Sequence, residues 1–235
     1  MKRIHPSFWV LGAVVLAFLG LLTITLLDHG PTGLDETILV ALEGWRSHEM
    51  TAVVKRLTDL GGHHFMIPLC TVLVVGVFWR WRRAGLFLAV SLGGSALLNE
   101  GLKVVVGRAR PTVVAALSSP RGLSFPSGHS QSTMAFAVAC FLLIWLARPA
   151  RRLVAASFFV LPLAVGWTRT YLGVHYPTDV LAGWCLASAW VIVCWTWLRN
   201  DQWPPFRAEA ATGSLRSSES APGAPGSDGD ALPPG

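Results

Sequence analysis

The feature that most constrains this chain is a series of six long apolar segments that together occupy most of its length. Most of them are close to the roughly 20 residues that a helix needs to cross the hydrocarbon core of a bilayer. Composition agrees, because 52% of the 235 residues are hydrophobic and 14% are charged, whereas about 25% are charged in an ordinary soluble domain. The sequence therefore predicts an all-α, six-transmembrane-helix bundle. Its segments lie at about 8–27, 65–79, 84–106, 130–147, 153–171 and 177–198.

The first apolar segment has a cleaved signal peptide as its alternative interpretation, because Lys2 and Arg3 precede it. The apolar part of a signal peptide is normally shorter than the stretch from Phe8 to Leu27. No cleavage site of the small-x-small type ends this stretch. We therefore favour a retained membrane helix.

The basic residues between the apolar segments predict how the chain is oriented in the membrane. With six spans, all four basic clusters fall on one side, which should be the cytoplasm because positive charge is enriched there. Both termini are then cytoplasmic, in a multi-pass protein of the plasma membrane. The opposite side receives three loops, at about 28–64, 107–129 and 172–176. The basic residues used are Lys2, Arg3, Arg80, Arg82, Arg83, Arg148, Arg151, Arg152 and Arg199.

Two regions outside the six segments have distinct compositions. The first outer loop, 28–64, is acidic and places Ile38, Leu39, Leu42 and Trp45 at mixed helical spacing. We expect one or two short amphipathic helices there, lying on the membrane surface. The region 200–235 is rich in Ser, Ala, Gly and Pro and is expected to be a disordered cytoplasmic tail. The chain thus divides into a membrane domain, 1–199, and this tail.

Two other classes of function find little support in the composition. The formal net charge of +6 would suit nucleic acid, but the basic residues form short clusters beside apolar segments rather than a basic helical face. The four cysteines lie within apolar segments, without the spacing of metal ligands, and are interpreted as small core residues. They are Cys70, Cys140, Cys185 and Cys194.

Three short motifs on the predicted outer side carry the chemistry. Together they supply three cations, two histidines, one carboxylate and a glycine at a helix start, a set that suits a phosphate group. Arginine can bind phosphate oxygens through a bidentate fork, and lysine adds a point charge. The alternative is that the cations are interfacial residues whose side chains reach toward lipid headgroups. The motifs are Lys103-x6-Arg110-Pro111, Pro126-Ser127-Gly128-His129 and Arg169-x5-His175-x3-Asp179.

The first two motifs are expected at helix ends. Seven residues, about two helical turns, separate Lys103 from Arg110, so a helix end stopped by Pro111 could place both on one side. Ser127 resembles an N-cap, with Gly128 just inside the helix. Helix N-termini bind anions, and glycine allows an oxyanion close to the backbone. Simple capping is the alternative for this pair.

The two histidines suggest a nucleophile and an acid. Pro177 suits the first position of a helix, so Asp179 would lie in the first turn, within reach of His175. A carboxylate on one imidazole nitrogen fixes the tautomer and leaves the other nitrogen for attack, although Asp179 could instead cap its own helix. His129 could protonate the leaving group, and its alternative is a histidine with an ordinary interior role.

In this order, the motifs resemble those of the type 2 phosphatidic acid phosphatases, also called lipid phosphate phosphatases. Thr168 stands where that family has serine, and it keeps the hydroxyl group. The resemblance implies six membrane helices, an extracytoplasmic site, a phosphohistidine on His175 oriented by Asp179, and His129 as general acid. It also implies that no metal or other cofactor takes part. It assigns phosphate binding to Lys103, Arg110, Ser127, Gly128 and Arg169.

Vanadium haloperoxidases share these motifs but are soluble, so the six apolar segments argue against that branch. The leading hypothesis is a phosphatase acting on phosphatidic acid, phosphatidylglycerol phosphate or undecaprenyl diphosphate, with a membrane lipid as its partner. A phosphotransferase acting on a lipid-linked phosphate is an alternative. A non-catalytic lipid-phosphate binder or transporter is another, but it gives no reason for His175, Asp179 and His129 together.

Overall fold

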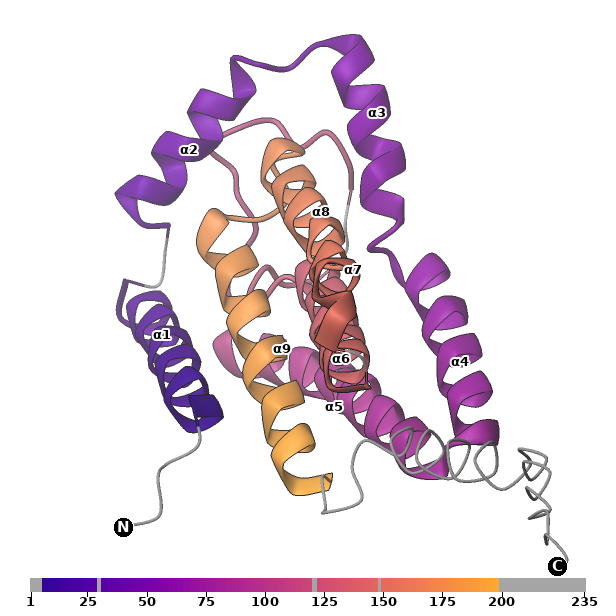
Figure 1. The fold of residues 1–235 in the computed structure, drawn as a ribbon. Coiled ribbons are helices and arrows are strands. Elements are labelled where there is room, and N and C mark those ends of the chain that lie inside the picture. Colours follow the sequence, from indigo (N-terminus) through magenta and orange to yellow (C-terminus); the bar gives the residue numbers. More distant parts are fainter. Residues whose placement is uncertain (1–5, 29–30, 120–121, 148, 199–235) are drawn as a thin grey trace, which may run out of the picture.

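The computed structural model describes residues 6–28, 31–119, 122–147 and 149–198, and within them the chain is helical apart from turns and loops (Figure 1). The predicted all-α class is confirmed for this part of the chain. The region 200–235 and the basic residues Lys2, Arg3, Arg148 and Arg199 lie outside it. The helices are α1 (Pro6–Asp28), α2 (Gly33–Glu43), α3 (His48–Asp59), α4 (His63–Arg80), α5 (Arg82–Val106), α6 (Gly128–Ala147), the 3-10 helix η1 (Pro149–Arg151), α7 (Arg152–Ser157), α8 (Val160–Tyr171) and α9 (Pro177–Leu198).

Several helices are suited to crossing a membrane. In the described residues, four helical stretches are long and apolar enough to do so: His48–Arg80, Arg82–Val106, Arg152–Tyr171 and Pro177–Leu198. Val10–Leu26 is a shorter apolar helix. Helix α6 is 20 residues long and begins with a polar turn. Membrane-spanning helices are thus present, while their number, six, stays a prediction.

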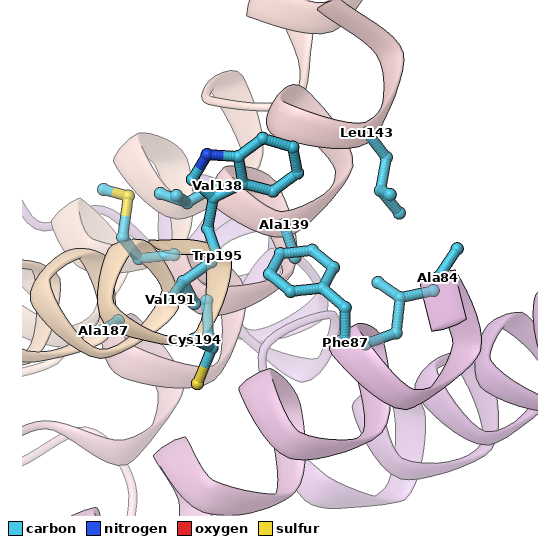
Figure 2. Close-up of a cluster of buried hydrophobic side chains, with 12 residues drawn as sticks. Ala84, Phe87, Val138, Ala139, Leu143, Ala187, Val191, Cys194 and Trp195 are labelled. Carbon is cyan, nitrogen blue, oxygen red and sulfur yellow. The ribbon is translucent and has the colours of Figure 1, made fainter. Parts of the chain in front are cut away.

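Helix α6 lies at the centre of the bundle and packs against α5, α8 and α9. Nearly all its side chains between Ser130 and Cys140 are buried, as in a helix surrounded by protein. In a cluster of apolar side chains that includes part of α6, Phe87 of α5 and Trp195 of α9 meet edge to face, with ring centroids 5.9 Å apart (Figure 2). This apolar cluster joins α5, α6 and α9 into one unit. Its buried members are Ala84, Phe87, Leu88, Met134, Ala135, Val138, Ala139, Leu143, Ala187, Val191, Cys194 and Trp195.

Two glycines allow α9 to approach its neighbours closely. A Cβ atom on Gly166 of α8 would lie 2.4 Å from Cζ2 of Trp184, and one on Gly94 of α5 would lie 2.5 Å from Cζ2 of Trp190. Both tryptophans belong to α9, so its indole rings occupy the space that a side chain at either glycine would fill. Larger residues would push α9 away and displace its first turn, which carries site residues.

Helices α2 and α3 lie at one end of the bundle, close to the ends of α8 and α9 (Figure 1). Leu39 and Val54 are fully buried beneath them, whereas Leu34, Trp45 and Val53 are mostly exposed. Two short helices with one buried side therefore form in the predicted first outer loop. Their position on the membrane surface stays a prediction.

The predicted segment 153–171 is not one continuous helix. Helix α7 ends at Ser157, and the N–H groups of Phe158 and Phe159 bond to Ala155 and Ala156 in tighter turns before α8 begins. Pro162 lies four residues beyond Phe158, and a proline ring clashes with the carbonyl four residues earlier. This accounts for the interruption near the middle of the expected segment.

Candidate active site

His175 lies in the turn between α8 and α9, with 2% of its surface exposed. Gly173 adopts a positive φ of 68° and reverses the chain just before it. The Nδ1 atom of His175 is 3.4 Å from Oδ2 of Asp179, and the Nε2 atom is 3.1 Å from a terminal guanidinium nitrogen of Arg110. The ring is thus fixed on both edges, with Nδ1 toward a carboxylate and Nε2 toward a cation.

Burial determines the protonation state of His175. Removal from water lowers its pKa from 6.5 to about 4, although the hydrogen bond and charge of Asp179 act in the opposite direction. The nearby Arg169 and Arg110 lower this pKa further. His175 is therefore neutral at physiological pH, with a lone pair on one ring nitrogen.

Asp179, in the first turn of α9, is fully buried and receives several donors. Its Oδ2 accepts a hydrogen bond from the hydroxyl of Ser124 and another, of 2.9 Å, from the N–H of Tyr176. Its Oδ1 lies 2.6 Å from Arg108. Asp179 thus bonds the residue before its own helix and also faces His175, which combines the two interpretations considered from sequence.

Sequence reasoning did not identify Arg108, Ser124 or Asp35 as site residues. Arg108 is 6% exposed and pairs with both Asp179 and Asp35 of α2. Its only sequence signal is its position two residues before Arg110. Asp35 is one of several acidic residues in the loop that the sequence predicts to be amphipathic. No spacing rule relates it to Arg108, which lies 73 positions further along the chain.

The end of α5 differs from the expected helix stop at Pro111. The helix ends at Val106, and Gly107 closes it in the left-handed conformation, with φ 65°, by donating to the carbonyl of Lys103. Glycine adopts that conformation without the strain that a side chain brings. Arg110 therefore lies in an irregular loop, four residues beyond the helix, rather than on the helix side that carries Lys103.

Arg110 and Lys103 already have protein partners. Arg110 donates to the carbonyls of Gly122, Leu123 and Val174 at 2.9, 3.2 and 2.8 Å. Burial lowers the pKa of Arg110, with Asp179 opposing the shift. Lys103 forms an ion pair with Glu100 at 2.9 Å. The backbone carbonyls hold the Arg110 guanidinium beside His175.

The start of α6 lies close to Lys103. A Cβ atom on Gly128 would be 3.2 Å from Oδ1 of Asn99 and 3.6 Å from Nζ of Lys103, so the glycine keeps this approach open. Ser127 accepts a 3.0 Å hydrogen bond from the hydroxyl of Ser130, and its N–H donates to the carbonyl of Asp179 at 3.0 Å. The N–H groups in the first turn of a helix lack intrahelical acceptors and can receive an anion.

Arg169 and His129 complete the group. Arg169 is 4% exposed at the end of α8 and donates to the hydroxyl of Thr58 at 2.9 Å. His129 packs over Gly61, and a Cβ atom built on Gly61 would lie 3.3 Å from the Cβ of His129. These contacts place α3 and the α3–α4 turn beside both residues.

A cavity of about 920 Å³ joins these residues. Its polar end is formed by Lys103, Arg110, His129, Arg169 and His175, and it continues as an apolar groove along α4 and α5. Within the described residues, no three His, Cys, Asp or Glu side chains are placed to hold one metal ion. The groove residues are Met66, Ile67, Cys70, Val74, Val75, Ala89, Leu92, Gly93 and Ala96.

The sequence is similar to those of known phosphatases. The chain is 34% identical over 158 residues to phosphatidylglycerophosphatase B of Bacillus subtilis, which covers 65% of this chain and 77% of that protein. It is 30% identical over 144 residues to an undecaprenyl-diphosphatase of Sulfolobus acidocaldarius, covering 57% and 64% of the two chains.

A solved structure has the same fold. The crystal structure of a transmembrane PAP2-type phosphatidylglycerolphosphate phosphatase from Bacillus subtilis superposes with a TM-score of 0.70 at 29% identity, covering 80% of this chain and 94% of that one. The family model of the PAP2 superfamily matches residues 84–203, which include all three motifs. With its motifs gathered around one cavity, this chain belongs to the PAP2 superfamily.

Proposed function

We propose that this protein hydrolyses a phosphate ester or diphosphate of a membrane lipid at the extracytoplasmic face, through a phosphohistidine on His175. One observation carries the proposal: a buried histidine, beside the Asp179 carboxylate, faces a cavity that is cationic at one end and apolar along the rest. Membership of the PAP2 superfamily and the phosphatases among its relatives support a membrane lipid phosphatase.

The lining of the cavity, polar at one end and apolar along the rest, favours an amphiphilic substrate. A phosphate would bind at the polar end, where Lys103, Arg110 and Arg169 provide positive charge and the start of α6 provides backbone N–H groups. An acyl or prenyl chain would lie in the groove between α4 and α5. By their names, the relatives act on phosphatidylglycerol phosphate and undecaprenyl diphosphate. Both lipids have a phosphate-containing head and an apolar chain, so both fit a cavity with a cationic end and an apolar groove.

The covalent step begins at Nε2 of His175. Asp179 accepts from Nδ1, so the lone pair is on Nε2, which now faces Arg110. When phosphate binds, Arg110 exchanges this contact for a phosphoryl oxygen. The Nε2–P bond then forms as the bond from phosphorus to the leaving oxygen breaks, and the cations stabilise the charge on the phosphoryl group.

His129 handles the proton in both halves of the reaction. Without substrate, burial and the neighbouring Arg169 lower the pKa of His129 to about 3. The negative charge of a bound phosphate opposes this effect, so His129 takes up a proton together with the substrate. It gives this proton to the leaving oxygen, so the lipid departs as an alcohol or, from a diphosphate, as a monophosphate. A water molecule then transfers its proton to His129 and attacks phosphorus. The N–P bond breaks, phosphate leaves, and His175 returns to its neutral form.

The basic residues support the proposed sidedness. Arg80, Arg82 and Arg83 lie at the junction of α4 and α5, which is at the opposite end of the bundle from α2 and α3 (Figure 1). If that junction faces the cytoplasm, the site lies on the outer side. Both termini would then be cytoplasmic.

Replacing the nucleophile tests the proposed reaction. Wild-type protein in detergent with EDTA should release inorganic phosphate from at least one of phosphatidic acid, phosphatidylglycerol phosphate and undecaprenyl diphosphate. His175→Ala should lower kcat by about 10⁴-fold or more, as loss of a covalent nucleophile does. His48→Ala, at an exposed position on α3, is the matched control and should retain activity. Wild-type rates in His175→Ala would rule out this nucleophile.

The dependence of kcat/KM on pH should reflect the lowered pKa of His175. Only the neutral imidazole attacks, and protonation removes its lone pair. Activity should therefore stay high as pH falls through 6.5 and should be lost as it falls through about 4. Because a phosphate monoester itself ionises near about pH 6, the substrate is titrated separately by phosphorus NMR. Protonation of an enzyme group that abolishes activity as pH falls through 6.5 would contradict this account.

Filling the groove tests whether the substrate is a lipid. Gly93 lines the cavity, and nothing lies within 4 Å of a Cβ atom built on it. Gly93→Trp should raise KM for long-chain phosphatidic acid at least about tenfold, because losing burial of two CH₂ groups costs roughly 1.6 kcal/mol. KM for soluble glycerol 3-phosphate should change little. Gly76→Trp, on α4 and outside the cavity lining, is the control. Equal changes for both substrates would contradict a lipid-binding groove.

A further inference from the structure

Asp35 lies at the N-termini of two helices at once. It is 1% exposed and forms the capping box of α2, with its Oδ2 accepting from the N–H of Thr32 at 3.3 Å. Its Oδ1 accepts from the N–H of Thr178, in the first turn of α9, at 3.0 Å. Helix N-termini favour negative charge. One carboxylate thus joins α2 to the start of the helix that carries Asp179.

Arg108 lies between two buried carboxylates. One terminal nitrogen is 3.0 Å from Oδ2 of Asp35, and the other is 2.6 Å from Oδ1 of Asp179. The guanidinium also lies over the ring of Tyr176, 4.3 Å from its centroid. Neither Arg108 nor Asp35 lines the cavity. Their direct contact with the groups that face His175 is the ion pair between Arg108 and Asp179.

We propose that Arg108 is a positioning residue, held by Asp35 of α2, that fixes the Asp179 carboxylate against His175. The inference rests on the proposed function of His175. The 3.4 Å separation between His175 and Asp179 is long for a hydrogen bond, so a small rotation of the carboxylate would break it. The contacts from Asp35 to Arg108 and from Arg108 to Asp179 thus link α2 to the active site.

A purely structural role is the competing explanation, because Arg108 also ties α2 to the bundle. Arg46 offers a matched control. It donates to the carbonyl of Tyr171 at 3.1 and 3.0 Å and to that of Ala115 at 2.8 Å. It therefore anchors the same region through backbone carbonyls rather than through Asp179. Loss of either arginine should loosen α2, but only Arg108 should act through the carboxylate.

A double-mutant cycle on the full chain separates the two explanations. With the most active lipid of the panel, Arg108→Gln should lower kcat by about 10–100-fold, as loss of residues that orient a reactive group does, and change KM little. In an Asp179→Asn background the same substitution should lower kcat less than about threefold, because the negative charge that Arg108 holds in place is gone. Arg108→Lys should restore part of the activity. Arg46→Gln should have the same effect in both backgrounds.

Equal losses from Arg108→Gln in both backgrounds would overturn the positioning role, and so would a raised KM with unchanged kcat. If Arg108→Gln does not fold, Asp35→Asn replaces it, with a smaller loss expected and the same dependence on Asp179. Wild-type protein without phosphatase activity would instead reject the proposed function. In that case, calorimetry measures the affinity of the same four variants for orthovanadate. If Arg108→Gln lowers this affinity equally in the wild-type and Asp179→Asn backgrounds, the inference is overturned.

Discussion

The buried carboxylate of Asp179 is the constraint on which the arrangement of the site depends. An ionised group removed from water must be paired and hydrogen-bonded, or it destabilises the fold. Here its partners come from the loop after α5, through Arg108 and Ser124, and from the turn before α9, through Tyr176 and His175. Satisfying one carboxylate therefore brings together chain segments far apart in sequence and fixes the imidazole at the same time.

The same requirement explains why the site lies at one end of the helices. The stretch between α5 and α6 is irregular, and its polar backbone groups need partners within the protein or water, which the centre of a bilayer does not provide. Arg110 and Arg46 meet part of this need by donating to loop carbonyls. Helices α2 and α3 cover the region, so this acidic part of the chain supports the site in addition to any contact with the membrane.

Sequence reasoning recovered the parts of the structure that follow local rules. Apolar length gave most helix bounds closely, and the three motifs meet at one cavity. The apolar segment 84–106 ends where α5 ends, but the first motif was expected on a helix stopped by Pro111, whereas Gly107 closes α5. The interruption between α7 and α8 was not predicted. Arg108 and Asp35 could not be found, since their significance arises only when α2 packs beside α9. Pairings of this kind depend on tertiary contacts, and spacing along one chain does not encode them.

The phosphoenzyme itself provides the most direct test of the central claim. Protein mixed with its lipid substrate, quenched in base within milliseconds and digested, can be searched by mass spectrometry for the peptide that contains the α8–α9 turn. We predict one acid-labile phosphoryl group on His175 of the wild-type protein and none on this peptide in a His175→Ala variant. A phosphoryl group on another residue, or turnover without any phosphoenzyme, would contradict the account.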